Sequence, residues 1–309
     1  MSTTTTSSSS NAPRPGGSAP LGDHAVARVG YGAMQLERLR GDRDAAVSLL
    51  RRAVELGIDH VDTAQFYGDG LSNGLLREAL RPEDGVTIVS KIGADPHSGG
   101  PAPMRPAQKP AELRASVEDN LRSLGVDQIP VVNLRRMEGR VSIPVPDDQI
   151  VDLDDQLAAM TAMRDEGLVG AFGLSSVTLE TLRRALPAGV ACVQNPYSLV
   201  ARDDEELLEL CEAEGIAWVP FFPLGSAFPG MPKVVDVPEV RTAAQALGVT
   251  PSQVGLAWLL HRSPRTLLIP GTTSVGHLEE NVAAGDIVLD ASTLAALDAS
   301  VPPAAGSIA

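Results

Sequence analysis

Residues 57–68, GIDHVDTAQFYG, and residues 86–93, VTIVSKIG, decide the fold that this sequence predicts. Each stretch contains a short apolar run typical of a buried strand, and a gap of one helix length separates them. Asp62 and Tyr67 follow the first run, and Lys91 follows the second. In a barrel of parallel strands, the residues at the carboxyl ends of the strands meet at the face where chemistry takes place. We therefore expect Asp62, Tyr67 and Lys91 to lie together.

A carboxylate, a phenol and an ammonium that meet in one place make a proton-transfer unit. Lys91 favours ionisation of the Tyr67 hydroxyl, and Asp62 keeps Lys91 charged and oriented. The alternative for each residue taken alone is a surface polar side chain at a strand end. The ordered set favours an enzyme.

The rest of the chain alternates between strand-like and helix-like stretches, which is typical of βαβ units and a parallel sheet. The strand-like runs are residues 58–61, 86–90, 129–134, 169–174, 190–195, 216–222 and 266–270, with an earlier one near 29–32. The helix-like stretches are residues 42–56, 110–124, 148–164, 178–186, 203–214 and 237–247, with Asp42 expected to cap the first. This order predicts an α/β fold, either a closed barrel or an open doubly wound sheet. No GxGxxG follows an early strand, which disfavours a Rossmann domain.

Length and composition set further limits. A barrel of this class uses about 250 residues as a single domain, which 309 residues accommodate. The net charge of −14 argues against a nucleic-acid partner. No run approaches about 18 apolar residues, so no membrane span is expected. Cys192 and Cys211 lie in apolar runs and are expected to be core residues, and no zinc-type spacing predicts a metal. A cytoplasmic protein is the expectation.

Three segments stand out from the regular alternation. Residues 1–22 are rich in Ser, Thr, Pro and Gly, and are expected to be a disordered tail before a single domain of residues 23–309. Residues 93–109 form a long Pro/Gly-rich insert directly after Lys91, either a substrate lid or an irregular surface loop. Residues 226–235 are a second candidate loop, over a cofactor.

Several stretches together resemble the aldo-keto reductase family. They are residues 57–68 and 86–93, and then NLRSLGVDQIPVVNL (120–134), DEGLVGAFGLSS (165–176), CVQNPYSLV (192–200), WVPFFPLGS (218–226) and LLIPGTTSVGHLEEN (267–281). The likeness runs from about Val29 to Asp298. It implies a (β/α)8 TIM barrel with a catalytic tetrad of Asp62, Tyr67, Lys91 and a fourth residue at the end of strand four.

The fourth position departs from the family, which has His there, whereas this sequence has Arg135. Strand parity places Arg135 on the same face as Val131 and Asn133. Arginine remains charged with a fixed fork of donors, so it polarises a carbonyl and stabilises a developing alkoxide but does not relay protons. The alternative is that Arg135 or Arg136 caps the strand in an ion pair. The stretch also resembles a bacterial branch that includes pyridoxal reductases, whose substrate carries an acidic phenol.

The resemblance also implies a nicotinamide cofactor, because no side chain here supplies a hydride. The positions that bind the carboxamide in the family match Ser175, Ser176 and Gln194. The position that stacks on the nicotinamide matches Phe221, and the positions that bind the adenine match Glu280 and Asn281. Ser274 and His277 fall near the position of a 2′-phosphate, where many relatives have Lys and Arg, and Thr273 and His277 make a less cationic pocket here. The resemblance implies NADPH, with a weaker preference over NADH than is usual in the family. The whole expected cofactor site comprises Gly32, Ala33, Met34, Asp62, Ser175, Ser176, Gln194, Phe221, Pro223, Leu224, Gly225, Ile269, Gly271, Thr272, Thr273, Ser274, His277, Glu280 and Asn281.

The leading interpretation is an NADPH-dependent reductase of a small aldehyde or ketone, with Tyr67 as the general acid. An NADPH-binding sensor with little turnover is the alternative from another class. A tailoring ketoreductase that acts on a larger ketone under the 93–109 segment is a third. The substrate and the oligomeric state do not follow from the sequence.

Overall fold

The computed structural model describes residues 13–139, 143–225 and 232–301. The strands are β1 (Ser18–Leu21), β2 (His24–Ala27), β3 (Tyr31–Gly32), β4 (His60–Asp62), β5 (Thr87–Ile92), β6 (Ala94–Pro96), β7 (Met104–Pro106), β8 (Ile129–Arg135), β9 (Val169–Ser175), β10 (Cys192–Gln194) and β11 (Ala217–Trp218). The α-helices are α1 (Arg43–Glu55), α2 (Leu71–Ala79), α3 (Pro110–Leu124), α4 (Leu153–Asp165), α5 (Leu179–Ala185), α6 (Glu205–Ala213), α7 (Pro238–Leu247), α8 (Pro251–Arg262), α9 (Val275–Ala283) and α10 (Ala291–Ser300). Short 3-10 helices are η1 (Ala33–Leu39), η2 (Pro82–Asp84), η3 (Asp147–Gln149), η4 (Leu186–Ala188), η5 (Val234–Asp236) and η6 (Ala284–Asp286).

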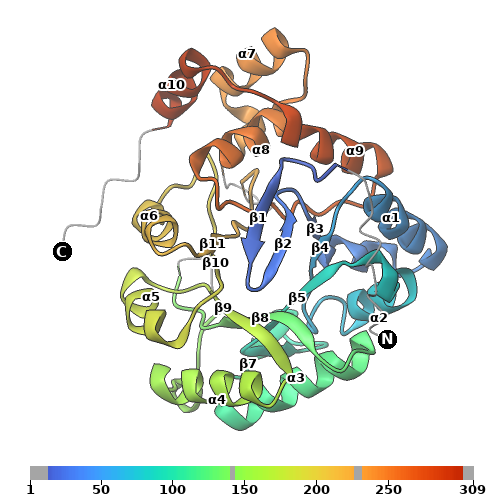
Figure 1. The fold of residues 1–309 in the computed structure, drawn as a ribbon, viewed down its shortest axis with the longest axis vertical. Coiled ribbons are helices and arrows are strands. Elements are labelled where there is room, and N and C mark those ends of the chain that lie inside the picture. The colour runs from blue at the N-terminus through green and yellow to red at the C-terminus, as the bar shows by residue number, and fades with distance from the viewer. Residues whose placement is uncertain (1–12, 140–142, 226–231, 302–309) are drawn as a thin grey trace, which may run out of the picture.

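Seven parallel strands form one curled sheet in the order β11-β10-β9-β8-β5-β4-β3, with helices around its outside (Figure 1). Residues 266–268 close it, because Thr266 bridges Trp218 at the end of β11 and Leu268 bridges Val29 before β3. Gly30 N donates to Leu268 O at 2.8 Å, and Leu267 N donates to Trp218 O at 2.8 Å. The expected eighth strand is therefore this bridging segment, and the fold is the predicted (β/α)8 TIM barrel rather than an open sheet.

An antiparallel hairpin of β1 and β2 lies across the amino end of the barrel (Figure 1). Ala19, Leu21 and Val26 are buried and pack against inward-facing strand residues, including Val131. The expectation of a disordered tail over residues 1–22 is therefore wrong for Ser18–Leu21, whereas residues 1–12 lie outside the described residues. Strand β1 has few apolar side chains, but they are enough to hold it in place because the residues at the amino end of the barrel cover them.

Helix boundaries follow the capping residues. Asp42 caps α1 as predicted, with its side chain accepting from Ala45 N at 3.1 Å. The helix expected from residue 148 begins instead at Leu153, because Asp152 caps it and residues 147–149 form a 3-10 turn. Helix α8 was not predicted. Its central residues 254–260 are all apolar or glycine and all buried, so it lacks the one-sided pattern of a surface helix.

The long insert after Lys91 contains an ordered hairpin rather than an irregular loop. Strands β6 and β7 pair antiparallel, and Arg105 donates to Asp95 across them at 3.1 Å. The prolines of this segment obscured the strands, since Pro96 and Pro106 stand at their ends, where a missing N–H is tolerated. Whether the hairpin acts as a lid stays a prediction. In the second candidate loop, residues 226–231 lie outside the described residues.

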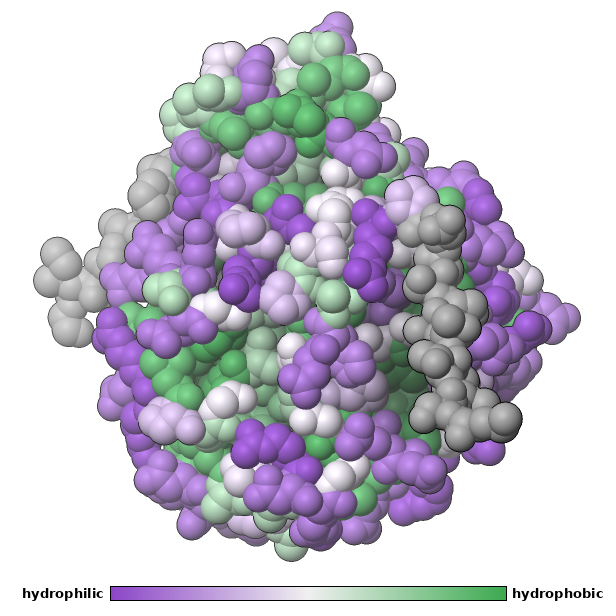
Figure 2. Space-filling model, in the orientation of Figure 1, coloured by the Kyte–Doolittle hydropathy of each residue, from purple (hydrophilic) through white to green (hydrophobic). Residues whose placement is uncertain are grey.

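The apolar core consists of separate clusters, of which the largest contains Cys211 and a smaller one contains Cys192; both cysteines are buried as expected. Within the described ranges, no helix is long and apolar enough to cross a membrane. The face in Figure 2 is mostly hydrophilic, and hydrophobic residues gather at the end where α7 and α10 lie and in recesses lower on the same face. The mixed surface agrees with the strong net charge of −14.

One histidine inside the barrel predicts acid sensitivity. His60 on β4 is buried, neither ring nitrogen has a hydrogen-bond partner in the described structure, and burial lowers its pKa to about 4. An unfolded histidine binds a proton near pH 6.5, so stability falls as the pH drops from about 6.5 to about 4. The linked loss reaches about 3 kcal/mol.

Urea unfolding of the wild type and of His60→Leu at pH 7 and pH 4.5 tests this expectation. The free energy of unfolding of the wild type should fall more steeply with acid than that of the variant. Equal losses in both proteins would mean that His60 does not carry the pH dependence.

Candidate active site at the carboxyl ends of the strands

One cavity of about 380 Å³ opens at the carboxyl ends of the barrel strands. It is lined by Gly32, Met34, Gln35, Asp62, Tyr67, Lys91, Arg135, Gln194, Phe221, Phe222, Pro223, Leu224, Gly225, Ser252, Ile269, Pro270, Gly271, Thr272, His277, Glu280 and Asn281. All four expected catalytic side chains are among them. The structure therefore brings together residues that lie up to 73 positions apart, from Asp62 to Arg135.

A buried ion pair between Lys91 and Asp62 joins β5 to β4 beneath this cavity. Lys91 Nζ also donates to Thr63 O at 3.0 Å, and Gln194 Nε2 donates to the other Asp62 oxygen at 2.8 Å. Lys91 and Asp62 are 3% and 2% exposed, so water contributes little to holding either charge. Every oxygen of the carboxylate thus has a protein donor.

The lysine stays charged in this setting. Burial lowers the pKa of Lys91, but the negative charge of Asp62 and the neighbouring Tyr67 outweigh it, and the pKa lies above the usual value. Lys91 Nζ lies 4.9 Å from the centre of the Tyr67 ring. The Tyr67 phenol therefore lies next to a charged ammonium.

Arg135 reaches the same cavity from the carboxyl end of β8. Its Nε atom is buried without a hydrogen-bond partner, and its guanidinium forms no ion pair with any residue that the structure describes. Its Cζ atom lies 5.9 Å from the centre of the Phe221 ring. Burial lowers the pKa of Arg135, and the nearby Tyr67 and Asp62 oppose that effect. The residue that forms an ion pair at the end of this strand is Arg136, whose Nε lies 2.6 Å from a carboxylate oxygen of Glu138.

Backbone strain gathers around this face of the barrel. Asp69, Met137, Ser176 and Phe222 are the non-glycine residues with positive φ in the described ranges, at 60°, 62°, 54° and 56°. All four lie in loops that follow the carboxyl ends of strands. Such conformations cost about 1–3 kcal/mol each and concentrate at functional sites. The strain supports the assignment of this face as the active site.

Most of the expected cofactor residues line the cavity. Ser175 and Ser176 do not, but they are fully buried, and neither their hydroxyls nor Gln194 Oε1 has a hydrogen-bond partner among the residues that the structure describes. Three unpaired polar groups at the ends of β9 and β10 fit the donors and acceptors of a carboxamide. The residues present therefore suit a nicotinamide.

Three other expected residues do not line the cavity: Ala33 is buried, Thr273 is exposed, and Ser274 caps α9. Four cavity residues were not predicted: Gln35, Phe222, Ser252 and Pro270. Phe222 stands next to Phe221 in an apolar run, where neighbouring residues of a regular strand would point to opposite faces, and it has a positive φ instead. Ser252 comes from α8, and nothing in its local sequence indicates a ligand.

The end of the cavity at α9 carries little positive charge. Lys91 and Arg135 are the only Lys or Arg residues lining the cavity in the described structure, and His277 and Glu280 lie at the α9 end. Because no Lys or Arg lines the α9 end of the cavity among the described residues, a weak preference for NADPH over NADH remains our prediction.

Comparison with known proteins gives the family context. The sequence model of the Aldo/keto reductase family matches residues 28–302. Pyridoxine 4-dehydrogenase of Escherichia coli strain K12 is 45% identical over 285 residues, which are 90% of this chain and 96% of that relative. An uncharacterized oxidoreductase of Schizosaccharomyces pombe is 38% identical over 96% of this chain and 94% of its own length.

Solved structures agree in fold. An aldo-keto reductase from Klebsiella pneumoniae in complex with NADPH has a TM-score of 0.78 and 27% sequence identity, covering 94% of this chain and 97% of its own. A second structure from that organism, with NADP and acetate, has the same TM-score at 26% identity, covering 93% and 96%. NADPH is therefore the cofactor that the fold and these relatives support.

The Lys91–Asp62 pair yields a stability prediction. Removing one partner of a buried ion pair leaves an uncompensated charge and costs about 3–5 kcal/mol. Lys91→Met should therefore lower the free energy of unfolding by that amount, and Asp62→Asn together with Lys91→Met should recover most of it. Urea unfolding of the two variants and the wild type measures this. A single variant as stable as the double variant would contradict a buried, mutually dependent pair.

Proposed function

This chain belongs to the aldo/keto reductase family and is an NAD(P)H-dependent oxidoreductase, and on that premise we propose that it reduces aldehydes carrying an adjacent phenol. Pyridoxal is the proposed substrate, and the alcohol pyridoxine is the product. Tyr67 is the proposed general acid.

The observation that carries the proposal is the guanidinium of Arg135, which lines the catalytic cavity and forms no ion pair with any residue that the structure describes. Arg135 is partly buried, and a cation withdrawn from water without a carboxylate partner is costly, so such a group is retained where a ligand completes its hydrogen bonds. A phenolate next to a carbonyl presents two oxygens to the planar fork of donors that arginine offers. The name of the relative at 45% identity, a pyridoxine 4-dehydrogenase, supports the same substrate.

The proposed chemistry divides between the cofactor and the four side chains. A bound nicotinamide supplies the hydride that reaches the carbonyl carbon. The Tyr67 hydroxyl donates its proton to the carbonyl oxygen, and the charge of Lys91 stabilises the phenolate that remains on Tyr67. Asp62 holds Lys91 in place through the buried ion pair. Arg135 orients the substrate and stabilises negative charge on its oxygens.

The proposed cofactor contacts follow from the lining of the cavity and from the buried hydroxyls of Ser175 and Ser176 beside Gln194 in the sheet. Gln194 and the two serines would hold the carboxamide, and the Phe221 ring would stack on the nicotinamide. Glu280 and Asn281 on α9 hold the adenine end. Because Phe221 also lies beside Arg135, the cofactor and the substrate-orienting cation share one wall of the cavity.

A matched pair of aldehydes tests the role of Arg135. The wild type should prefer 2-hydroxybenzaldehyde to 2-methoxybenzaldehyde in kcat/KM, and Arg135→Gln should reduce that ratio by at least about tenfold. The estimate follows from about 1.5–3 kcal/mol for a hydrogen bond to a charged group. Arg135→Lys, which keeps the charge but loses the fork, should retain part of the ratio. An unchanged ratio in Arg135→Gln would reject phenol recognition by Arg135.

A further inference from the structure

The strands that carry Lys91 and Arg135 are tied together by a side chain at the point where their ladder ends. The pairing of β5 with β8 ends at Ile92 and Leu134. The next carbonyls, those of Gly93 and Arg135, both accept hydrogen bonds from Gln108 Nε2, at 2.6 Å and 2.7 Å. Gln108 thus donates both of its amide hydrogens and joins the two strand ends just beyond the last backbone pair.

Gln108 is itself fixed on every side. It is 3% exposed, its backbone N–H donates to Gln149 Oε1 at 2.7 Å, and its own Oε1 accepts from Gln156 Nε2 at 2.9 Å. Gln156 Nε2 also donates to Gln108 O at 2.8 Å. A buried amide with all its hydrogen-bonding groups satisfied has one orientation, so it holds the two carbonyls at a fixed separation.

The close approach at Gly93 makes this arrangement tight. Gly93 has φ of +90°, and a Cβ atom there would lie 2.4 Å from Arg135 O. Only glycine allows the two backbones to come this close. Movement of the β8 end is therefore limited from the Gly93 side as well as by Gln108.

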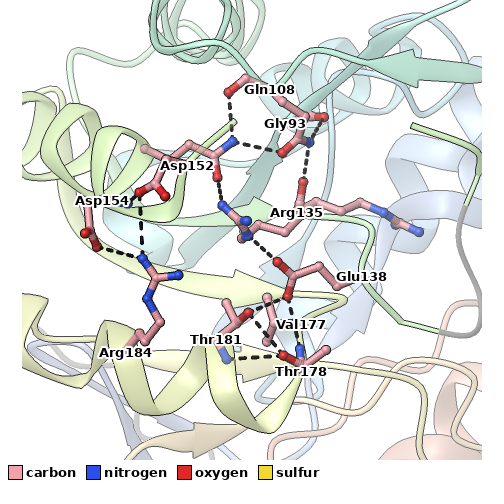
Figure 3. Close-up of polar contacts among 12 residues, drawn as sticks. Gly93, Gln108, Arg135, Glu138, Asp152, Asp154, Val177, Thr178, Thr181 and Arg184 are labelled. Atoms are coloured by element: carbon pink, nitrogen blue, oxygen red, sulfur yellow. Dashed lines mark hydrogen bonds and ion pairs between the residues drawn. The ribbon is translucent and has the colours of Figure 1, made fainter. Parts of the chain in front are cut away.

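The residues after Arg135 are anchored on the opposite side. Arg136 donates to Gln156 and to Glu138, and Glu138 accepts from Thr181 Oγ1 at 2.6 Å. Figure 3 shows this network on one side of the strand, with the Gln108 amide at the Arg135 carbonyl and the Arg135 guanidinium extending away from it. The backbone of Arg135 is held while its side chain is left free to face the cavity.

We propose that Gln108 is a positioning residue for Arg135: by joining Gly93 O to Arg135 O, it sets where the guanidinium stands relative to Lys91 and Tyr67. This inference rests on the proposed function of Arg135. Displacement of a catalytic or orienting group by about 1 Å can cost as much as about 100-fold in rate, so loss of the Gln108 amide should weaken phenol recognition without removing a substrate contact.

The test is a double-mutant cycle with the two aldehydes. Gln108→Leu should lower kcat/KM for 2-hydroxybenzaldehyde about tenfold and for 2-methoxybenzaldehyde less than threefold. In the Arg135→Gln background, Gln108→Leu should change the ratio of the two by less than twofold. Binding of NADPH, followed by fluorescence titration, should be unchanged in Gln108→Leu.

Gln128→Leu is the matched control, since Gln128 immediately precedes the same strand and its amide donates to Gly167 O at 2.9 Å at the far end. It should leave the ratio of the aldehydes unchanged. Equal losses on both aldehydes in Gln108→Leu, or a loss that persists without Arg135, would show a general structural role and overturn the inference. An Arg135→Gln variant with the wild-type ratio rejects the proposed function itself, and the inference with it.

Gln108→Glu keeps the inference testable if Gln108→Leu does not fold. A carboxylate repels the two carbonyls that it faces, whereas its protonated form donates one hydrogen bond. The ratio of the two aldehydes, relative to the wild type at the same pH, should therefore recover as the pH falls. A wild-type ratio at every pH, or a reduced ratio that does not respond to pH, would overturn the inference.

Discussion

The active site depends on one buried ion pair, between Lys91 and Asp62. Two charges taken out of water are held only if their remaining hydrogen-bonding groups are satisfied. Thr63 O and Gln194 Nε2 provide those partners, which ties β4, β5 and β10 together at one point. The pair keeps an ammonium beside the Tyr67 ring, where a free lysine would otherwise turn toward solvent.

A second cation changes what this site can select. Tyr67 lies near Arg135 as well as Lys91, and Arg135 has no ion pair in the part of the chain that the structure describes, whereas Asp62 is already engaged by Lys91 and Gln194. The catalytic end of the cavity therefore has an excess of positive charge inside a protein of net charge −14. This local positive charge favours the binding of an anionic oxygen on the substrate. A neutral histidine at the position of Arg135 would not provide it.

Much of the site was predictable because its residues stand next to strands with clear apolar patterns. Asp62, Tyr67, Lys91 and Arg135 each follow such a run, and the period of two along β8 placed Arg135 inward. Strand Ser18–Leu21 was missed because its environment, the barrel floor, comes from residues far along the chain. Gln108 was missed for a similar reason. Its partners are the carbonyls of Gly93 and Arg135 and the amide of Gln156, and they come together only through tertiary packing.

The central claim is that Tyr67 supplies a proton to an aldehyde held beside Arg135. Oxidation of NADPH with pyridoxal, by the wild type and by Tyr67→Phe, tests it most directly, with fluorescence titration of NADPH binding in both proteins. The account predicts turnover of pyridoxal by the wild type, loss of turnover by at least about 100-fold in the variant, and nearly equal NADPH affinity. Comparable rates in the two proteins would contradict the role of Tyr67. Tight NADPH binding without turnover of pyridoxal by the wild type would contradict the assigned substrate and favour a cofactor-binding sensor.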